Sequence, residues 1–172
     1  MGKVQIRTLS VDDWELYKSL RLASLLESPS AFGSTFKSES DLSSCDWKLK
    51  LDLATHKNKA LPLVAEVDGE PHGLVWGVIH DAHSTSAHIY QMWVKPESRG
   101  QGVGRLLLRA LIAWATELRL NSLYLTVNQD NSAAISFYES IGFSFTVTSS
   151  ENLQSKPLNS HLMVFGLNGV GA

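Results

Sequence analysis

The residues with the clearest chemical potential form a glycine-rich segment, Arg99-Gly100-Gln101-Gly102-Val103-Gly104-Arg105. A predicted strand ends before it at Val94, and a helical pattern follows it. A helix N-terminus presents unpaired backbone N–H groups and the positive end of the helix dipole, so an anion is held there without a special side chain. Glycines let the backbone approach that anion closely, and the flanking arginines add positive charge. The segment therefore predicts an anion site.

Two well-known phosphate loops do not fit this segment. A Walker loop ends in Gly-Lys-Ser/Thr, and no such triplet follows Gly104. The dinucleotide spacing Gly-x-Gly-x-x-Gly is not met, and no acidic residue stands at the end of the next predicted strand. A P-loop nucleotide and a nicotinamide dinucleotide are therefore disfavoured. On this segment alone, a glycine-rich connection that binds nothing remains the alternative.

A second group of chemically capable residues surrounds a later predicted helix. Asn131 is placed to cap its start, and the phenol of Tyr138 follows two turns further on. In open α/β sheets, ligands bind beyond the carboxyl ends of the strands, which is where this helix begins. The alternatives are a plain helix cap for Asn131 and a core aromatic for Tyr138.

These two segments together resemble two motifs of the GCN5-related N-acetyltransferase (GNAT) family. Residues 94–104 are similar to its motif A, Arg/Gln-x-x-Gly-x-Gly/Ala, matched by Arg99, Gly102 and Gly104. Residues 125–143 are similar to its motif B, matched by Asn131, Ala133, Tyr138 and Gly142-Phe143. The resemblance is close over residues 60–145. It is looser over residues 1–60, where it rests on element order and a Pro-x-Ala-Phe-Gly-Ser-Thr-Phe stretch.

The resemblance implies an enzyme that moves an acetyl group from acetyl-coenzyme A (acetyl-CoA) to a primary amine by direct attack in a ternary complex. Loop amides from Gly100 to Arg105 would hold the pyrophosphate, and the strand end at Met92 to Val94 would pair with the pantetheine. Tyr138 would be the general acid for the coenzyme A sulfur. The expected cofactor-binding residues are Met92, Trp93, Val94, Arg99, Gly100, Gln101, Gly102, Val103, Gly104, Arg105, Asn128, Asn131, Ala133 and Tyr138.

The general base is the less determined part of the chemistry. In some family members it is an acid or a histidine on the strand before the loop. His88 stands on that strand, on the same predicted face as Tyr90 and Met92, and an imidazole exchanges protons near neutral pH. Glu66, His80 and a chain of water molecules are the alternatives, and His88 could equally be an ordinary strand residue.

The amine acceptor is expected to bind between the N-terminal helices and the loop at residues 28–37. Phe32, Phe36 and Trp14 are the candidates to line that site, with core packing as the alternative for each. No acidic cluster in this region calls for a polyamine, so the acceptor stays a primary amine of a small molecule or of a peptide or protein.

Hydrophobic periodicity predicts the elements that position these residues. Asp68-Gly69 predicts a hairpin, and Val103, Leu107, Ala110, Trp114 and Leu118 form one apolar helix stripe. The predicted strands are 4–8, 61–67, 72–80, 87–94, 123–127, 143–148 and 161–167, and the predicted helices are 12–27, 41–57, 102–119 and 132–140.

This element order predicts an α/β (α+β) fold in one domain over residues 1–172. The expected GNAT-type architecture is a mixed, mostly antiparallel twisted sheet of about seven strands with helices on both faces. A length of 172 residues and a hydrophobic content of 44% are sufficient for one such core.

The amino-acid composition limits the kinds of partner and compartment that are expected. A net charge of −2 argues against nucleic-acid binding, and no apolar run is long enough for a membrane span. Cys45 is the single cysteine and no secretory leader is visible, so a cytoplasmic protein is expected. No metal is expected. Pairing or exchange of the last two strands favours a homodimer by analogy with the fold.

Two other functions compete with the transferase. A catalytically silent acyl-CoA binding or sensing domain would use the same fold, and Tyr138 is the residue that favours an enzyme instead. A protein that binds a nicotinamide cofactor would need the dinucleotide spacing that this chain does not have.

Overall fold

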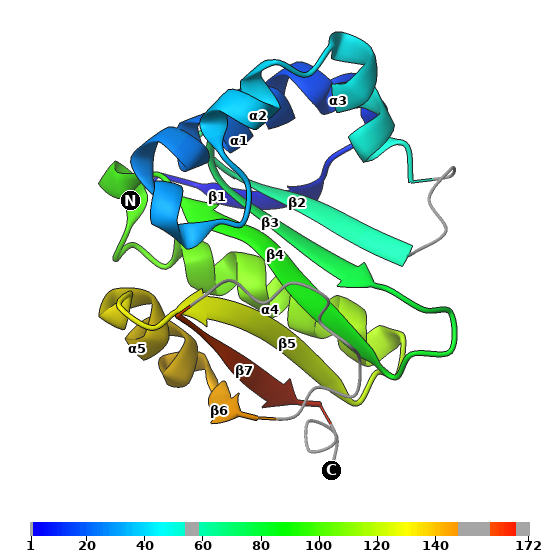
Figure 1. The fold of residues 1–172 in the computed structure, drawn as a ribbon, viewed down its shortest axis with the longest axis vertical. Helices are drawn as coiled ribbons and strands as arrows, with labels where there is room; N and C mark the ends of the chain where they lie inside the picture. The colour runs from blue at the N-terminus through cyan, green and yellow to red at the C-terminus, as the bar shows by residue number, and fades with distance from the viewer. Residues whose placement is uncertain (1, 54–58, 148–158, 168–172) are drawn as a thin grey trace.

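A computed structural model describes residues 2–53, 59–147 and 159–167, which form one seven-stranded sheet flanked by helices (Figure 1). The sheet order is β1-β2-β3-β4-β5-β7-β6. Its strands are β1 (Val4–Thr8), β2 (Lys59–Val67), β3 (Glu70–Ile79), β4 (Ser86–Val94), β5 (Ser122–Asn128), β6 (Ser144–Thr146) and β7 (Ser160–Gly166). Every neighbouring pair is antiparallel except β4 and β5.

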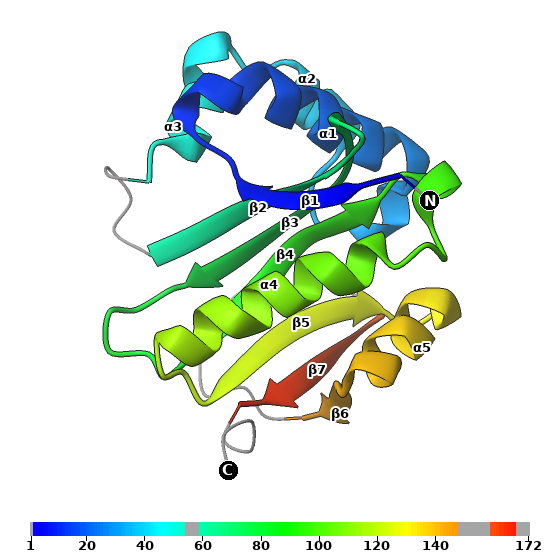
Figure 2. The ribbon, with the colours of Figure 1, turned by 180° about the vertical axis from the view of Figure 1, so that it is seen from behind.

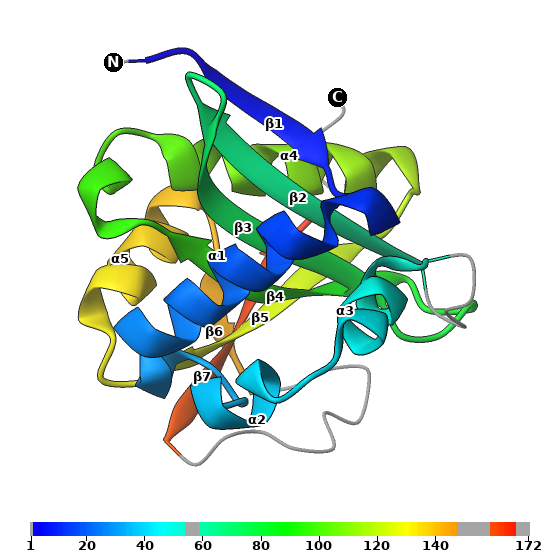
Figure 3. The ribbon, with the colours of Figure 1, turned by 90° about the horizontal axis from the view of Figure 1, so that it is seen from above.

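Helices cover both faces of this sheet. The helices are α1 (Trp14–Glu27), α2 (Phe36–Ser40), α3 (Ser44–Leu51), α4 (Val103–Glu117) and α5 (Ser132–Ile141), with short 3-10 turns η1 (Val11–Asp13), η2 (Pro29–Ala31) and η3 (Pro96–Ser98). α4 and α5 lie on one face, and the first three helices lie on the other (Figures 2 and 3). This confirms the predicted mixed, mostly antiparallel sheet with helices on both faces.

Each face has its own hydrophobic core. The α4 face buries Leu107, Leu111 and Met163 completely, and the α1 face buries Trp47 and Leu74 completely. α4 is the crossover helix between the parallel strands β4 and β5, and its apolar stripe packs on both of them. The loop that enters α4 and the loop that leaves β5 therefore come to the same end of the sheet.

The α4 stripe differs in part from the prediction. Val103 and Leu107 are buried as expected, whereas Leu118 is 38% exposed because α4 ends at Glu117. The buried row instead continues through Leu111 and Ala115, which are four residues apart, in step with the period of 3.6 residues.

The predicted helix over residues 41–57 is also wrong in its bounds, because within this range the structure has the shorter helix α3 (Ser44–Leu51). α2 (Phe36–Ser40) precedes the range, and each of the two helices is started by a capping box. The hydroxyl of Ser43 accepts from the amide of Asp46 at 3.2 Å, so α3 starts there and a separate helix precedes it. Residues 54–57 of that prediction, and most of the predicted loop between the last two strands, lie outside the described residues.

The hairpin prediction is confirmed. Asp68 and Gly69 have φ angles of 51° and 87°, as a two-residue hairpin turn requires, and they join β2 to β3.

Candidate active site

The central feature of the candidate site is the separation of β4 from β5. The two strands pair from Ser86–Ser122 to Ile89–Leu125, although β4 continues to Val94 and β5 to Asn128. Figure 1 shows the two strands diverging towards these ends. The β4 backbone beyond Ile89 is therefore not used in the ladder with β5 and is available to an added extended chain.

A bulge in β4 accompanies this separation. Gln91 has a φ of 54°, and the register against β3 shifts between Leu74 and Trp76. An extra residue in a strand reverses the alternation of side chains beyond it. Met92 accordingly packs on the α4 core, as Ile89 does, whereas Trp93 joins the core on the α1 side.

The glycine loop uses its glycines for two different reasons. Gly100 and Gly102 have φ angles of 73° and 85°, and nothing lies within 4 Å of a Cβ built at either one. Gly102 is the N-cap of α4 and supplies no side-chain cap, so the amides of the first turn stay available to a ligand. Gly104 is helical instead, and a Cβ there would meet Phe137 Cζ at 3.0 Å and Met92 Cε at 3.1 Å. The prediction attributed all three glycines to the anion, and at Gly104 a side chain would in addition crowd Phe137 and Met92.

The polar side chains of the loop are tied to protein groups. Arg99 donates from Nε to the carbonyl of Val94 at 2.9 Å and forms an ion pair with Glu27. Gln101 donates to the carbonyl of Glu97 at 2.8 Å. Arg105, at the start of α4, donates to Ser140 Oγ on α5 at 3.1 Å and so links the two helices.

The helix after β5 brings the predicted acid to this region. The side chain of Asn131 accepts from the amide of Ala134 at 3.1 Å and caps α5, as predicted. Ala133 lies in the first turn and is exposed. Tyr138 is 8% exposed, with ring contacts to Phe137 and Phe143 at 5.4 and 5.8 Å between centroids. This burial raises the pKa of the Tyr138 phenol well above its ordinary value.

The segment after α1 reaches the far side of the separated strands. Asn128, the last residue of β5, donates from Nδ2 to the carbonyl of Ser30 at 3.4 Å and accepts from the amide of Asp130 at 2.9 Å. The predicted acceptor segment therefore touches the end of β5.

The predicted base, His88, is buried. It is 3% exposed, and its ring lies against those of Tyr124 and His80 at 5.4 and 5.2 Å between centroids. His80 Nε2 and the Tyr90 hydroxyl are 2.7 Å apart. Met92 is not on this face, contrary to the prediction, because the bulge at Gln91 lies between them.

The three predicted acceptor aromatics come from three different elements. Phe32 lies 4.9 Å from the Arg21 guanidinium, and Phe36 starts α2. Trp14 starts α1 and lies near Lys48, 5.5 Å from its ammonium nitrogen. α1 has 14 residues, about 21 Å of helix, and its other end contacts the glycine loop. Trp14 is therefore remote from that loop.

Glu66 and Cys45, two further residues considered from the sequence, lie on other elements of the fold. Glu66, an alternative base, accepts from Arg7 at 2.9 Å on the β1–β2 side of the sheet. Cys45 is exposed on α3. Within the described residues, no group of His, Cys, Asp or Glu is arranged to hold a metal, and no helix has the length and apolar character to cross a membrane.

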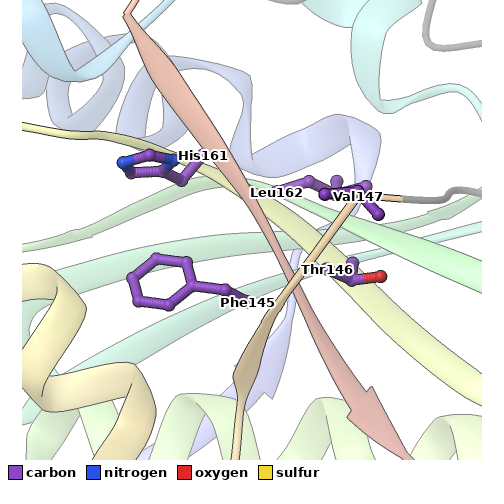
Figure 4. Close-up of a pocket in the computed structure, with 5 residues that line it drawn as sticks. All are labelled: Phe145, Thr146, Val147, His161 and Leu162. Atoms are coloured by element: carbon purple, nitrogen blue, oxygen red, sulfur yellow. The ribbon is translucent and has the colours of Figure 1, made fainter.

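A pocket of about 580 Å³ lies apart from the glycine loop, on β6 and β7 (Figure 4). Phe145 and His161 contribute rings whose centroids are 5.2 Å apart. The other lining residues are Thr146, Val147 and Leu162. No residue expected in the catalytic site lines it.

The model of the acetyltransferase (GNAT) family matches residues 21–143, more than half of the chain. The chain belongs to this family, which confirms the resemblance carried by the two motifs.

Sequence relatives are similar over part of their length. A mycothiol acetyltransferase of Tsukamurella paurometabola is 34% identical over 79 residues, covering 46% of this chain. The chain spans only 27% of that relative. The peptidyl-lysine N-acetyltransferase YjaB of Salmonella typhimurium is 28% identical over 123 residues, covering 64% of this chain and 81% of YjaB.

Solved structures share the fold over nearly the whole chain. PaiA N-acetyltransferase from Thermoplasma acidophilum, in complex with coenzyme A, has a TM-score of 0.74 at 19% identity and covers 95% of this chain and 99% of PaiA. RimJ of Mycobacterium smegmatis, in complex with CoA-disulfide, has a TM-score of 0.75 at 22% identity and covers 99% of this chain and 85% of RimJ.

Proposed function

We propose that the protein transfers the acetyl group of acetyl-CoA to a primary amine by direct attack in a ternary complex. The observation that carries this proposal is the end of the sheet where β4 and β5 separate after Ile89–Leu125, with the glycine loop beyond one strand and Tyr138 beyond the other. Membership of the GNAT family supports the donor, as do the coenzyme A complexes among the structural neighbours.

The proposed donor site uses mainly backbone groups. Pantetheine would lie along Met92–Val94, where β4 is free of β5, and pair as an added strand. The pyrophosphate would lie on the amides of the loop and of the first turn of α4. Its negative charge is stabilised there by the positive end of the helix dipole.

The proposed chemistry forms one bond and breaks one. The amine lone pair attacks the thioester carbon, the C–N bond forms, and the C–S bond breaks as the electron pair returns to sulfur. The phenol of Tyr138 gives its proton to that sulfur. Its raised pKa means that the phenol carries its proton before the reaction.

The amine must also lose a proton, and the face that carries His88 supports a route for it. His88 is too buried to meet a substrate directly, so we propose it as a positioning residue behind Tyr90. Tyr90 is 38% exposed and shares a hydrogen bond with exposed His80. The proposed route runs from the amine to Tyr90 and then to His80, whose imidazole takes the proton.

The proposed acceptor is a chemical class, primary amines. YjaB is named as a peptidyl-lysine N-acetyltransferase, and the relative from Tsukamurella paurometabola is named as a mycothiol acetyltransferase. A primary amine of a small molecule or of a peptide or protein fits both descriptions. Phe32 and Phe36, from the α1–α2 side, are the proposed acceptor contacts, and the place of Trp14 favours core packing instead.

A cytoplasmic location and a homodimer are part of the same proposal. The single cysteine supports a reducing compartment. β6 ends the sheet order and exposes half of the Phe145 side chain, which supports pairing with a second copy.

Thiol release over a panel of amines, including lysine peptides, tests the transferase. Turnover of at least one amine, lost in Tyr138→Phe, is the expected result. Tight acetyl-CoA binding without turnover of any amine would instead favour the sensing domain, and absence of acetyl-CoA binding would contradict both.

A further inference from the structure

Arg99, the arginine of the glycine loop, has its guanidinium engaged by neighbouring protein groups. Nη1 and Nη2 donate to the two carboxylate oxygens of Glu27 at 3.1 and 2.6 Å, and Nε donates to the carbonyl of Val94 at 2.9 Å. A fork-to-fork pair of this kind fixes direction as well as distance, because both components are planar.

Glu27 collects donors from three parts of the chain. Besides Arg99, its carboxylate accepts from Trp93 Nε1 of β4 at 2.9 Å and from the hydroxyl of Ser28. The hydrogen bonds from Arg99, ahead of those from Ser28 and Trp93, lower the pKa of Glu27 to about 2. The carboxylate therefore stays ionised at any pH at which the protein would work.

This arrangement ties the end of α1 to both borders of the loop. Val94 is the last residue of β4, and Arg99 directly precedes Gly100. The hydrogen bond from Arg99 to Val94 thus connects the two ends of the segment between them. Glu27, at the end of α1, binds the same guanidinium from the opposite face of the sheet to α4. The positive charge of Arg99 is thus paired with a carboxylate.

We propose that Glu27 is a positioning residue for the acetyl donor, and that Arg99 serves donor binding by fixing the loop through Glu27 rather than by contacting the pyrophosphate. This rests on acetyl-CoA being the donor. Glu27 lies 72 residues before Arg99 and belongs to neither motif of the donor site.

A double-mutant cycle on the full chain tests the proposal, with acetyl-CoA affinity measured by calorimetry. Glu27→Gln and Arg99→Gln are each expected to weaken binding about tenfold, and the double variant to bind no more weakly than either one, since both remove the same contact. Arg99→Lys is expected to be as weak as Arg99→Gln, because lysine keeps the charge and loses the fork. Glu97→Gln, an exposed acid of the same loop, is the matched control.

Other outcomes overturn the proposal. If Arg99 met the pyrophosphate directly, Glu27→Gln would release it and tighten binding, and Arg99→Lys would retain most of the affinity. Removing a direct contact would also reduce the salt dependence of binding, whereas the proposal predicts the same salt dependence in Arg99→Gln as in the unmodified chain. Failure of the unmodified chain to bind acetyl-CoA would contradict the proposed function, a result distinct from all of these.

Discussion

The hydroxyl of Tyr17 in α1 donates to Oε1 of Gln91, the bulge residue of β4, across 3.0 Å. Tyr17 is 1% exposed, and burial raises its pKa to about 12 despite the opposing effect of this hydrogen bond. The phenol therefore remains a donor throughout the neutral and alkaline range. Helix α1 thus holds the bulge residue two positions beyond Ile89, the last residue of β4 that pairs with β5.

Tyr17→Phe tests this link. The variant leaves the Gln91 amide oxygen without its donor, and we expect the free energy of unfolding to fall by about 1–2 kcal/mol. We expect a larger relative effect on turnover than on stability, because the bulge sets the path of Met92–Val94. Urea unfolding and thiol release measure the two effects. Ser19→Ala, on the exposed side of α1, is the control, and an unchanged rate in Tyr17→Phe would show that the bulge is held by other contacts.

Tyr138→Phe separates the chemical step from donor binding. The phenylalanine keeps the buried ring and removes only the hydroxyl, so acetyl-CoA affinity should stay within about threefold, while thiol release falls by about 10²–10⁴-fold as expected for loss of a general acid. Ser136→Ala, on the exposed side of α5, should change neither. The raised pKa keeps the Tyr138 phenol protonated below pH 10. Between neutral pH and pH 10, the unmodified chain should therefore show no decline in rate that is absent from Tyr138→Phe. Such a decline would contradict a buried neutral acid.

The glycines of the loop should respond differently to alanine. Gly102→Ala is expected to cost about 1–2 kcal/mol of stability through its left-handed backbone, although its surroundings are open. Gly104→Ala is expected to act through packing, because the new methyl meets Phe137 and Met92. Phe137→Leu removes the crowded Cζ. Combined with Gly104→Ala it should therefore restore acetyl-CoA affinity, whereas combined with Gly102→Ala it should not. Equal rescue of both would refute the distinction.

The buried ion pair between Arg21 and Glu39 predicts a pH dependence of stability. Nη2 of Arg21 lies 2.8 Å from Oε1 of Glu39, and the two side chains are 5% and 9% exposed. Burial alone would raise the pKa of Glu39, but hydrogen bonds and the charge of Arg21 outweigh it and the pKa is lowered. A lowered folded-state pKa gives stability above the unfolded pKa, near 4.3, that is lost as pH falls through the folded value.

Glu39→Gln should therefore destabilise the fold by about 3–5 kcal/mol at pH 7, since it leaves a buried guanidinium without its counterion. The difference from the unmodified chain should shrink as the pH is lowered from 5 to 3. Thermal unfolding at several pH values measures it, with exposed Glu70→Gln as the control. A difference that is constant with pH would show that the carboxylate charge is not the source.

The two motifs could be recognised from sequence because each lies within a short stretch. The helix caps, the hairpin turn at Asp68-Gly69 and the alternation in β5 are set by residues a few positions apart, and these predictions were confirmed. The bulge at Gln91 could not be predicted, since an extra strand residue has no compositional mark, and it moved Met92 to the opposite face from His88.

The contacts around the loop were missed for a related reason. Glu27 appears in the sequence as the polar end of an amphipathic helix, and its partner Arg99 appears as part of a phosphate motif. Only the packing of α1 against the sheet brings them together, and no spacing in the chain indicates it. Arg105 and Ser140 likewise meet only because α4 and α5 are neighbours.

Glu27 and Ser30 stand three residues apart and attach to opposite sides of the separated strands, one to Arg99 beyond β4 and the other to Asn128 at the end of β5. A short stretch of the proposed acceptor side is thus anchored at both borders of the proposed donor site. Evolution of a new amine preference through this stretch would therefore be constrained by the donor as well. Exchange of residues 27–35 between family members should carry donor affinity along with acceptor choice, and engineering of either property would have to select for both.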